Sequence, residues 1–199
     1  MERSEQQEQR LQALAALREL GIEPYPAAEF PVTHSTQSAL AAFDALSQSR
    51  ATVVLAGRMR ARRIMGNASF FTLADEHGQL QVYVRRDEIC PGDDKTLYNT
   101  VFKKLLDLGD IVGVEGYLFT TQTGEKSLHA NRIVLLAKSV RPMPVVKEKD
   151  GQVFDALSDP EVRYRQRYLD LAVNRGTQET FRKRRTIIRA MRDFFDSKG

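Results

Sequence analysis

The spacing of hydrophobic residues predicts helices in the first 50 residues of the chain. Over residues 5–20, leucines recur every three positions with alanines between them, which places an apolar stripe along one side of a helix. Gly21 ends this helix, and two nearby prolines make the connection that follows irregular. A shorter helix is expected over residues 36–46, because a cluster of Ser and Thr residues can cap its start. Residues 1–50 should therefore form an N-terminal helical segment.

Alternating polar and apolar positions follow and predict strands. Residues 51–61 and 69–74 are rich in β-branched, aromatic and alternating side chains, and Gly66 and Asn67 between them are typical of a turn. Residues 79–85 alternate in the same way after a second turn. Three antiparallel strands in succession are therefore expected.

A helix and two more strands complete the expected domain. Residues 91–108 return to a helical pattern. Its apolar stripe consists of Leu97, Val101, Leu105 and Leu108. Residues 111–119 and 127–137 alternate again, with a Thr-Gly turn between them. The order β-β-β-α-β-β is that of an OB-fold, a mainly β, five-stranded barrel, which we expect over residues 51–140. Strand count alone does not fix closure, so a different small barrel stays open.

The last third of the chain is expected to hold a linker and a long helix. Residues 141–162 begin with two prolines among several charges and little apolar pattern, which is typical of a linker. Residues 163–199 include a predicted helix over residues 177–197, with an apolar stripe on one side and arginines and lysines around the rest. A domain boundary should therefore lie in the linker.

The composition excludes several classes of protein. Hydrophobic residues make up 42% and charged residues 28%, as in soluble globular proteins, and no apolar run is long enough to span a membrane. The N-terminus shows no secretory signal and the single cysteine cannot form an internal disulfide, so we expect a cytoplasmic protein. A formal net charge of +4 permits a polyanionic partner without requiring one.

A row of arginines marks the first predicted strand. Arg58, Arg60 and Arg62 stand at a spacing of two and are followed by Arg63. Alternation predicts that the first three share one face, where they would form a basic surface for a phosphate backbone. A solvated edge strand protected by charge has the same pattern, so the row alone leaves both interpretations open.

An aromatic residue beside this row favours nucleic acid. Phe71 shares a face with Leu73, so if that face is the barrel core, Phe70 points outward, close to the arginines. An exposed ring of this kind can stack on an unpaired base. Gln81 and Tyr83 would share the outer face, and the Gln81 amide has both a donor and an acceptor for a base edge. The combination favours single-stranded nucleic acid over a purely structural barrel.

Motifs for catalysis are absent from the sequence. No glycine-rich loop joins a strand to a helix, and no serine or cysteine stands in a nucleophile motif. The three histidines are far apart and have no cysteine at ligand spacing, so no metal site is expected. The residues therefore predict a binding module.

Four stretches of sequence carry a family resemblance. They are residues 62–66 (Arg-Arg-Ile-Met-Gly), 68–70 (Ala-Ser-Phe), 123–125 (Thr-Gly-Glu) and 163–171. Together they resemble the N-terminal half of bacterial-type lysyl-tRNA synthetases, and the resemblance covers essentially the whole chain. Residues 168–171 also resemble aspartyl and asparaginyl synthetases of the same subclass, so the lysyl assignment depends on the earlier stretches.

The resemblance implies a function and a set of contacts. The family has an OB barrel that binds a U-rich anticodon, followed by a class II catalytic domain that activates lysine with ATP and magnesium and transfers it to tRNA. Carried over by position, Phe70 stacks on an anticodon base, Gln81 and Glu125 bind base edges through hydrogen bonds, and Arg63 contacts the same loop. The residues alone had not indicated Glu125, which reads as a solvated turn residue.

The end of the chain resembles the start of the class II domain. The helix over residues 177–197 is similar to the family's first motif, which builds the homodimer interface of complete enzymes through the region that begins at residues 163–199. The second and third motifs, which hold ATP and the adenylate, are missing from the sequence. We therefore expect this polypeptide to bind tRNA without aminoacylating it and to hold no cofactor of its own, while the complete enzyme uses ATP and Mg.

Three other interpretations stay open. The first is a free-standing OB-fold module that binds single strands without sequence preference. The second is the anticodon-binding part of an aspartyl- or asparaginyl-tRNA synthetase, and the third is a structural or dimerisation barrel without any role in RNA binding. The preference among stem-loops, or the failure to bind one at low salt, separates them.

Overall fold

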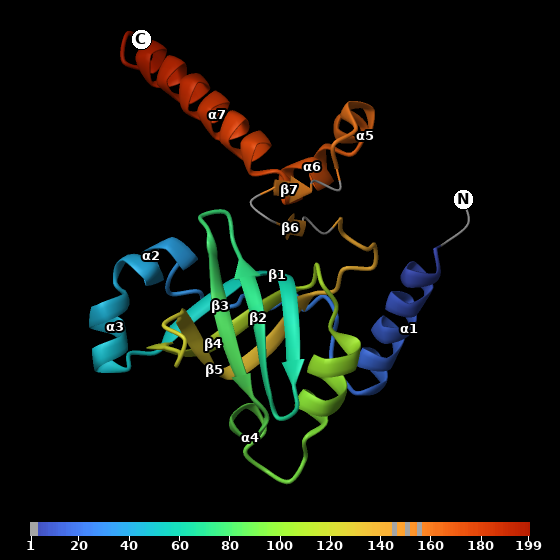
Figure 1. The fold of residues 1–199 in the computed structure, drawn as a ribbon. Coiled ribbons are helices and arrows are strands. Elements are labelled where there is room, and N and C mark those ends of the chain that lie inside the picture. The colour runs from blue at the N-terminus through green and yellow to red at the C-terminus, as the bar shows by residue number, and fades with distance from the viewer. Residues whose placement is uncertain (1–3, 145–146, 150–151, 155–156) are drawn as a thin grey trace. The chain divides into compact units, whose positions relative to one another are not determined.

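The chain divides into two units, Met1–Pro142 and Met143–Gly199. The computed structural model describes residues 4–144, 147–149, 152–154 and 157–199. Figure 1 shows the first unit as a set of strands with helices on either side of them.

A closed five-stranded barrel forms the centre of the first unit. Its strands are β1 (Val53–Met65), β2 (Ala68–Ala74), β3 (Gln79–Arg85), β4 (Ile111–Thr120) and β5 (Lys126–Ala137). They follow the order β1-β2-β3-β5-β4, and β1 pairs with β4 to close the ring. The pairs are antiparallel except β3 with β5, which run parallel. The predicted order of five strands is therefore confirmed, and the question of closure is answered.

The barrel core follows from the alternation in the strands. β2 and β3 bury every second side chain, so Phe71 and Leu73 point inward together with Val82. These side chains meet Val112 and Leu128 from the other strands, each with no exposed surface. The side chains between them, including Phe70, lie on the outer face.

A bulge at Arg60 interrupts the alternation of β1. Arg58 pairs with Ala74 and Met59 with Leu73, but it is Ala61, and not Arg60, that pairs with Thr72. The extra residue reverses the parity of the strand beyond it. Arg58 therefore falls on one face and Arg62 on the other. The prediction that Arg58, Arg60 and Arg62 share a face is wrong for this reason.

The helices of the first unit pack on two sides of the barrel (Figure 1). Helix α1 (Glu5–Glu19) is capped by Ser4 and buries Leu17. The Arg10 guanidinium on α1 donates to the main-chain oxygens of Leu108 and Ser139, both at 2.9 Å. The predicted helix over residues 36–46 is instead two helices, α2 (Thr36–Ala41) and α3 (Phe43–Ser49), because the chain leaves helical geometry at Ala42.

The helix between β3 and β4 differs from the prediction. It consists of a short α4 (Arg86–Ile89) and a π-helix, η1 (Leu97–Leu105). Of the predicted stripe only Val101 is fully buried, and its buried neighbours are Tyr98, Phe102 and Leu106. The i→i+5 hydrogen bonds of a π-helix place more residues in each turn than the 3.6 of an α-helix, so the buried side falls on other positions.

The second unit is mainly helical. It contains a two-stranded antiparallel sheet of β6 (Lys147–Lys149) and β7 (Gln152–Phe154), then α5 (Pro160–Arg165), α6 (Arg167–Val173) and α7 (Arg175–Asp196). The predicted linker over residues 141–162 includes residues 145–146, 150–151 and 155–156, which lie outside the described residues. No helix in the described part of the chain is long and apolar enough to cross a membrane.

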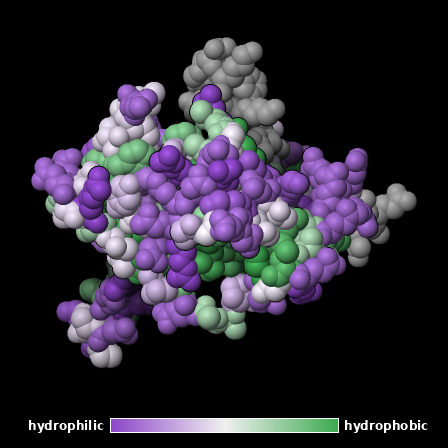
Figure 2. Space-filling view, turned by 90° about the horizontal axis from the view of Figure 1, so that it is seen from below, coloured by the Kyte–Doolittle hydropathy of each residue, from purple (hydrophilic) through white to green (hydrophobic). Residues whose placement is uncertain are grey.

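The surface of the protein is mostly polar on the face seen in Figure 2, with a hydrophobic patch near its middle. One apolar groove of about 280 Å³ lies in the first unit. Leu97, Val101 and Ile133 are among the residues that line it.

Candidate nucleic-acid interface

The outer face of the barrel aligns side chains from four strands. One row across the sheet runs from Phe70 on β2 to Tyr83 on β3 and His129 on β5. The adjacent row runs from Thr72 to Gln81. It continues to Ser127 and Phe119, so side chains that are far apart in sequence are neighbours here.

Aromatic rings fill the middle of this face. The Phe70 and Tyr83 ring centroids are 5.0 Å apart, and Tyr83 lies 5.7 Å from Phe119. His129 packs beside these rings, 5.0 Å from Tyr83 and 5.3 Å from Phe119, and is 9% exposed. We call Phe70, Tyr83 and Phe119 the aromatic platform. Offset and tilted ring pairs at these distances stabilise one another, so the platform is held in place.

A groove of about 720 Å³ opens over the aromatic platform. It is lined by Ala61, Arg62, Arg63, Met65, Ala68, Phe70, Phe71, Thr72, Gln81, Tyr83, Phe119, Thr121, Gln122 and Thr123. This volume lies within the range of small-molecule sites, and the combination of aromatic walls with a few polar groups is typical of them.

The structure places Phe70 where the alternation predicts it. Phe71 is 2% exposed inside the barrel, whereas Phe70 is partly exposed and lines the groove together with Gln81. The Gln81 amide nitrogen donates to the Ser127 hydroxyl at 2.9 Å. This hydrogen bond fixes the orientation of the amide, with its nitrogen toward Ser127 on β5.

The arginines of β1 have different surroundings. Arg63 is exposed, lines the groove and pairs in register with Phe70. Arg62 instead donates to the main-chain oxygens of Phe102 and Leu106 at the end of η1, and Arg58 donates to that of Gly109. Burial lowers the pKa of both Arg58 and Arg62, while Asp110 opposes the shift. Their guanidinium groups therefore serve the fold, and the predicted basic face is reduced chiefly to Arg63.

Glu125 lies on the turn between β4 and β5. Its main-chain N–H donates to the Thr121 hydroxyl and its carbonyl accepts from the Thr121 N–H, both at 3.0 Å. Gly124 has φ +85°, which glycine adopts without strain. The Glu125 side chain is exposed, two residues beyond Thr123, and is not among the residues that line the groove.

Sequence reasoning missed Phe119 and His129. Both stand at outward positions of their predicted strands, but only the pairing of β5 with β3 and β4 brings them to Tyr83. A β-carbon at Gly116 would lie 1.8 Å from the main-chain oxygen of His129, so only glycine lets the two strands approach this closely. The isolated histidine gave no signal of this position.

His129 is enclosed by polar groups as well as rings. Its Nδ1 atom contacts the Tyr117 hydroxyl, and its Nε2 atom lies 2.6 Å from Oε2 of Glu88 without the alignment of a hydrogen bond. Burial lowers the pKa of His129; Glu88 opposes this, and Arg85 and Arg50 lower the pKa further. Burial of the ring beside Tyr83 and Phe119 therefore favours the neutral form.

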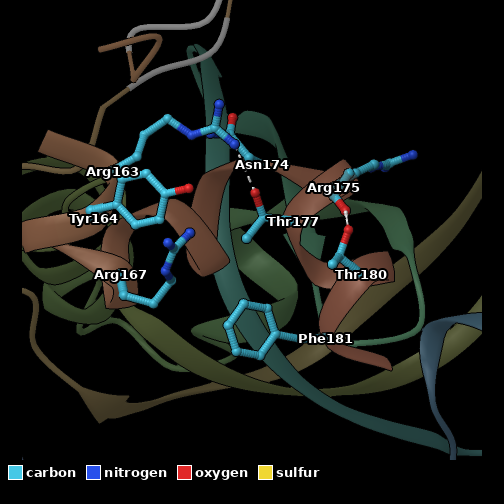
Figure 3. A pocket seen from close by; sticks show the side chains of 9 residues that line it. Arg163, Tyr164, Arg167, Asn174, Arg175, Thr177, Thr180 and Phe181 are labelled. Carbon is cyan, nitrogen blue, oxygen red and sulfur yellow. Dashed lines mark hydrogen bonds between the residues drawn. The ribbon is translucent and has the colours of Figure 1, made fainter. Parts of the chain in front are cut away.

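A second pocket, of about 520 Å³, lies within the second unit (Figure 3). Arg163 contacts Asp170 at 3.0 Å and also donates to the Thr177 hydroxyl, as the dashed line in Figure 3 marks. Arg167 binds the same carboxylate. Burial raises the pKa of Asp170, but hydrogen bonds from Asn174, Arg163 and Thr177 outweigh it and the pKa lies below its ordinary value. Arg163 thus joins α5 to α6 and α7, while Arg167 binds Asp170 within α6.

No group of three or more His, Cys, Asp or Glu side chains is placed to hold a metal ion among the residues that the structure describes. The outer face of the barrel has the features of a binding surface: rings for stacking, an oriented amide, and one exposed guanidinium group.

Known proteins resemble the chain along its full length. A family described as an OB-fold nucleic acid binding domain matches residues 53–136, which confirms the predicted fold. A lysine–tRNA ligase of Porphyromonas gingivalis (strain ATCC BAA-308 / W83) is 50% identical over 200 residues, covering 100% of this chain and 35% of that protein. One from Azobacteroides pseudotrichonymphae is 50% identical, covering 98% and 39%. One from Christiangramia forsetii is 49% identical, covering 98% and 34%. The chain thus spans roughly a third of the length of these relatives.

Proposed function

The chain is a homologue, along its whole length, of the N-terminal portion of lysine–tRNA ligases, and we propose that its OB-fold barrel binds the anticodon loop of a tRNA. The observation that carries this proposal is the position of Phe70, partly exposed beside Gln81 in a groove of about 720 Å³. A flat ring at the side of an open groove offers a stacking surface for an unpaired base.

Three side chains of the groove have separate roles in this proposal. Phe70 stacks on one anticodon base. Gln81, whose amide is oriented by Ser127, binds the edge of that base through a donor and an acceptor. Arg63 neutralises a phosphate of the same RNA loop. Its guanidinium group is exposed, so it can reach the phosphate of a flexible RNA strand.

A preference for a U-rich anticodon is the finer part of the proposal. Uracil presents both carbonyl oxygens and an N–H on its edge, which suits the mixed donor and acceptor of Gln81. The Glu125 carboxylate accepts hydrogen bonds only, so at the groove rim it suits an N–H of uracil or guanine. Gln81 and Glu125 together therefore support a preference for particular anticodon bases.

The activity of the whole protein is proposed from its relatives. We infer that the complete protein joins lysine to tRNA in the cytoplasm, with ATP and Mg, as the name of its relatives indicates.

We also propose that the second unit takes part in a homodimer of the complete enzyme. Helix α7 exposes large hydrophobic side chains along its length. They are Phe181, Ile187, Ile188, Met191, Phe194 and Phe195. A contiguous apolar surface of this kind is usually covered by a partner or by another domain.

Replacement of Phe70 tests the anticodon proposal. Phe70→Ala should weaken binding of a stem-loop with a U-rich anticodon by about 1 to 3 kcal/mol, because the stacking surface is lost. The measurement is a fluorescence titration of the wild type and the variant at one fixed salt concentration.

Phe70→Tyr is the matched control, since it keeps the ring and should bind nearly as the wild type does. Equal affinities of Phe70→Ala and the wild type would reject the proposal. Equal affinities for poly-U and poly-C would favour a non-selective OB module, and a preference for an aspartate or asparagine anticodon would favour those ligases.

A further inference from the structure

The groove on the outer face of the barrel has a thioether in its wall. Met65 is the last residue of β1, is 48% exposed, and lines the groove together with Arg63 and Phe70. Met65 stands two positions after Arg63 on β1, so the two side chains share one face of the strand. Besides its apolar surface, a thioether offers a sulfur atom that peroxides oxidise.

We propose that Met65 is a site of reversible oxidation by hydrogen peroxide, and that its sulfoxide weakens the binding of RNA in the groove. The effect on RNA rests on the proposed function and adds a means of regulating the same site. In the reaction, the sulfur of Met65 attacks one oxygen of the peroxide, the O–O bond breaks and an S=O bond forms. The second oxygen leaves as hydroxide, takes the proton of the first and becomes water, so the sulfur loses two electrons and the peroxide gains them.

Exposure distinguishes Met65 from the other methionines. The described part of the chain contains Met59, Met65, Met143 and Met191. Met59 lies on the same strand but has no exposed surface and belongs to the barrel core, so peroxide does not reach it in the folded protein. Met191 is 56% exposed, in the second unit. Because oxidation requires access to the sulfur, Met65 is the reactive methionine among the described residues of the first unit.

The single cysteine does not compete for the peroxide. Cys90 is 5% exposed and packs within the hydrophobic core of the first unit. Cysteines buried in this way are inert, because reaction requires an accessible thiolate. The exposed thioether of Met65 should therefore react before this thiol does.

The surroundings of Met65 make its oxidation matter for binding. The thioether is apolar, whereas the sulfoxide carries a polar oxygen in the wall of the groove. RNA that covers this oxygen has to supply a donor or remove the oxygen from water without one, which weakens binding. The Arg63 guanidinium is a donor on the same face of β1. A hydrogen bond from Arg63 to the sulfoxide would draw this group away from the phosphate to which the proposed function assigns it.

The position at the end of a strand suits a reversible modification. Met65 directly precedes the turn at Gly66, which has φ +62°, and the neighbouring Ile64 is 42% exposed. Methionine sulfoxide is returned to the thioether by sulfoxide reductases, which need access to the side chain. A sulfur beside an exposed turn offers such access.

The experiment compares each protein with itself before and after treatment with hydrogen peroxide. Wild type, Met65→Leu and Met191→Leu are treated in the folded state, freed of peroxide and titrated with a U-rich anticodon stem-loop, while mass spectrometry of peptides locates the added oxygen. The wild type should take up oxygen at Met65 and Met191 before Met59. After treatment it should bind roughly 5- to 150-fold more weakly, the effect of burying one polar group without a full partner. Met191→Leu should lose affinity by the same factor.

Met65→Leu is the decisive variant. Leucine keeps an apolar side chain of similar volume and cannot form a sulfoxide, so the affinity of this variant should be the same before and after treatment. A methionine sulfoxide reductase should return the treated wild type to its starting affinity. The stem-loop should also slow the oxidation of Met65 in the wild type without slowing that of Met191, because RNA in the groove covers only the first of these side chains.

Three results would each overturn the inference. Met65 could take up oxygen no faster than Met59, the treated wild type could bind within about twofold of the untreated protein, or Met65→Leu could lose as much affinity as the wild type.

The outcomes also separate this inference from the proposed function. If Phe70→Ala weakens binding and oxidation does not, the anticodon proposal stands and the inference alone is rejected. If Phe70→Ala binds the stem-loop as tightly as the wild type, the anticodon proposal is rejected, and the effect assigned to the sulfoxide is rejected with it.

Discussion

Two adjacent arginines, Arg62 and Arg63, have different roles because their side chains lie on opposite faces of β1. The bulge at Arg60 decides which of the two lies on which face. Both line the groove, but Arg62 pairs with the buried Phe71 and binds carbonyl oxygens at the end of η1, whereas Arg63 is exposed and pairs with Phe70. Arg62 thus stabilises the fold, whereas Arg63, one position further along the strand, is exposed at the surface.

This difference predicts two distinct effects of the same substitution. Arg62→Gln should lower the free energy of unfolding by about 1 to 3 kcal/mol, because buried carbonyls lose a charged donor. Arg63→Gln should leave stability within about 0.5 kcal/mol of the wild type, as exposed sites usually do. It should weaken RNA binding. It should also reduce the slope of the logarithm of the binding constant against the logarithm of salt concentration by about one, as expected for the loss of one phosphate contact. Urea unfolding and titrations at several salt concentrations measure both; identical behaviour of the two variants would contradict the assignment.

At the scale of elements, Asp75 ties helix α2 to the turn between β2 and β3. Its carboxylate accepts from the Thr36 main chain and hydroxyl, both at 2.7 Å, and from the His77 and Gly78 N–H groups at 2.8 and 2.9 Å. Burial raises the pKa of Asp75, but these four hydrogen bonds outweigh it and the pKa is lowered. The ionised form therefore stabilises the contact.

Asp75→Asn should lower stability at neutral pH by about 1 kcal/mol, a typical cost of losing a side-chain acceptor at a helix start. A lowered folded-state pKa contributes stability that is present above the unfolded value of about 3.9 and is lost as pH falls through the folded value. The difference between variant and wild type should thus shrink below about pH 4. Urea unfolding at neutral and acidic pH measures it, and a constant difference would contradict the role of the carboxylate.

The elements that the sequence predicts well are those defined by local patterns. Alternation identifies the five strands and places Phe70 outside and Phe71 inside, because side chains on a strand face opposite sides in turn. The bulge at Arg60 and the π-helix η1 are not local properties, since they depend on the register with β2 and on packing against the barrel. Phe119 and His129 join the site only through strand pairing.

At the scale of the whole molecule, the two units have separate sets of internal contacts. The barrel, helices α1 to α3 and η1 belong to Met1–Pro142, and every residue of the groove lies in this unit. In the second unit, Asp170 joins α5, α6 and α7 through Arg163 and Thr177. The groove, and with it the proposed RNA-binding site, therefore lies in the first unit alone.

A chain that ends at Pro142 should keep the binding site intact. It should unfold cooperatively and bind the U-rich stem-loop within about threefold of the full chain, because a change of less than 1 kcal/mol is expected when no groove contact is lost. Thermal unfolding and the same titration test it. A shortened chain that unfolds without cooperativity would show that the barrel depends on residues beyond 142.

The bulged strand β1 pairs with β4 over residues 53–58 and with β2 over residues 58–65, so only Arg58 has register partners in both neighbouring strands. Among the described strands, residues 61–65 pair with β2 alone. Such an open edge could template a strand of another chain and start aggregation. Charged side chains at an edge oppose this, and the exposed Arg63 stands at this one. Besides its proposed contact with a phosphate, Arg63 is therefore expected to oppose self-association through the sheet.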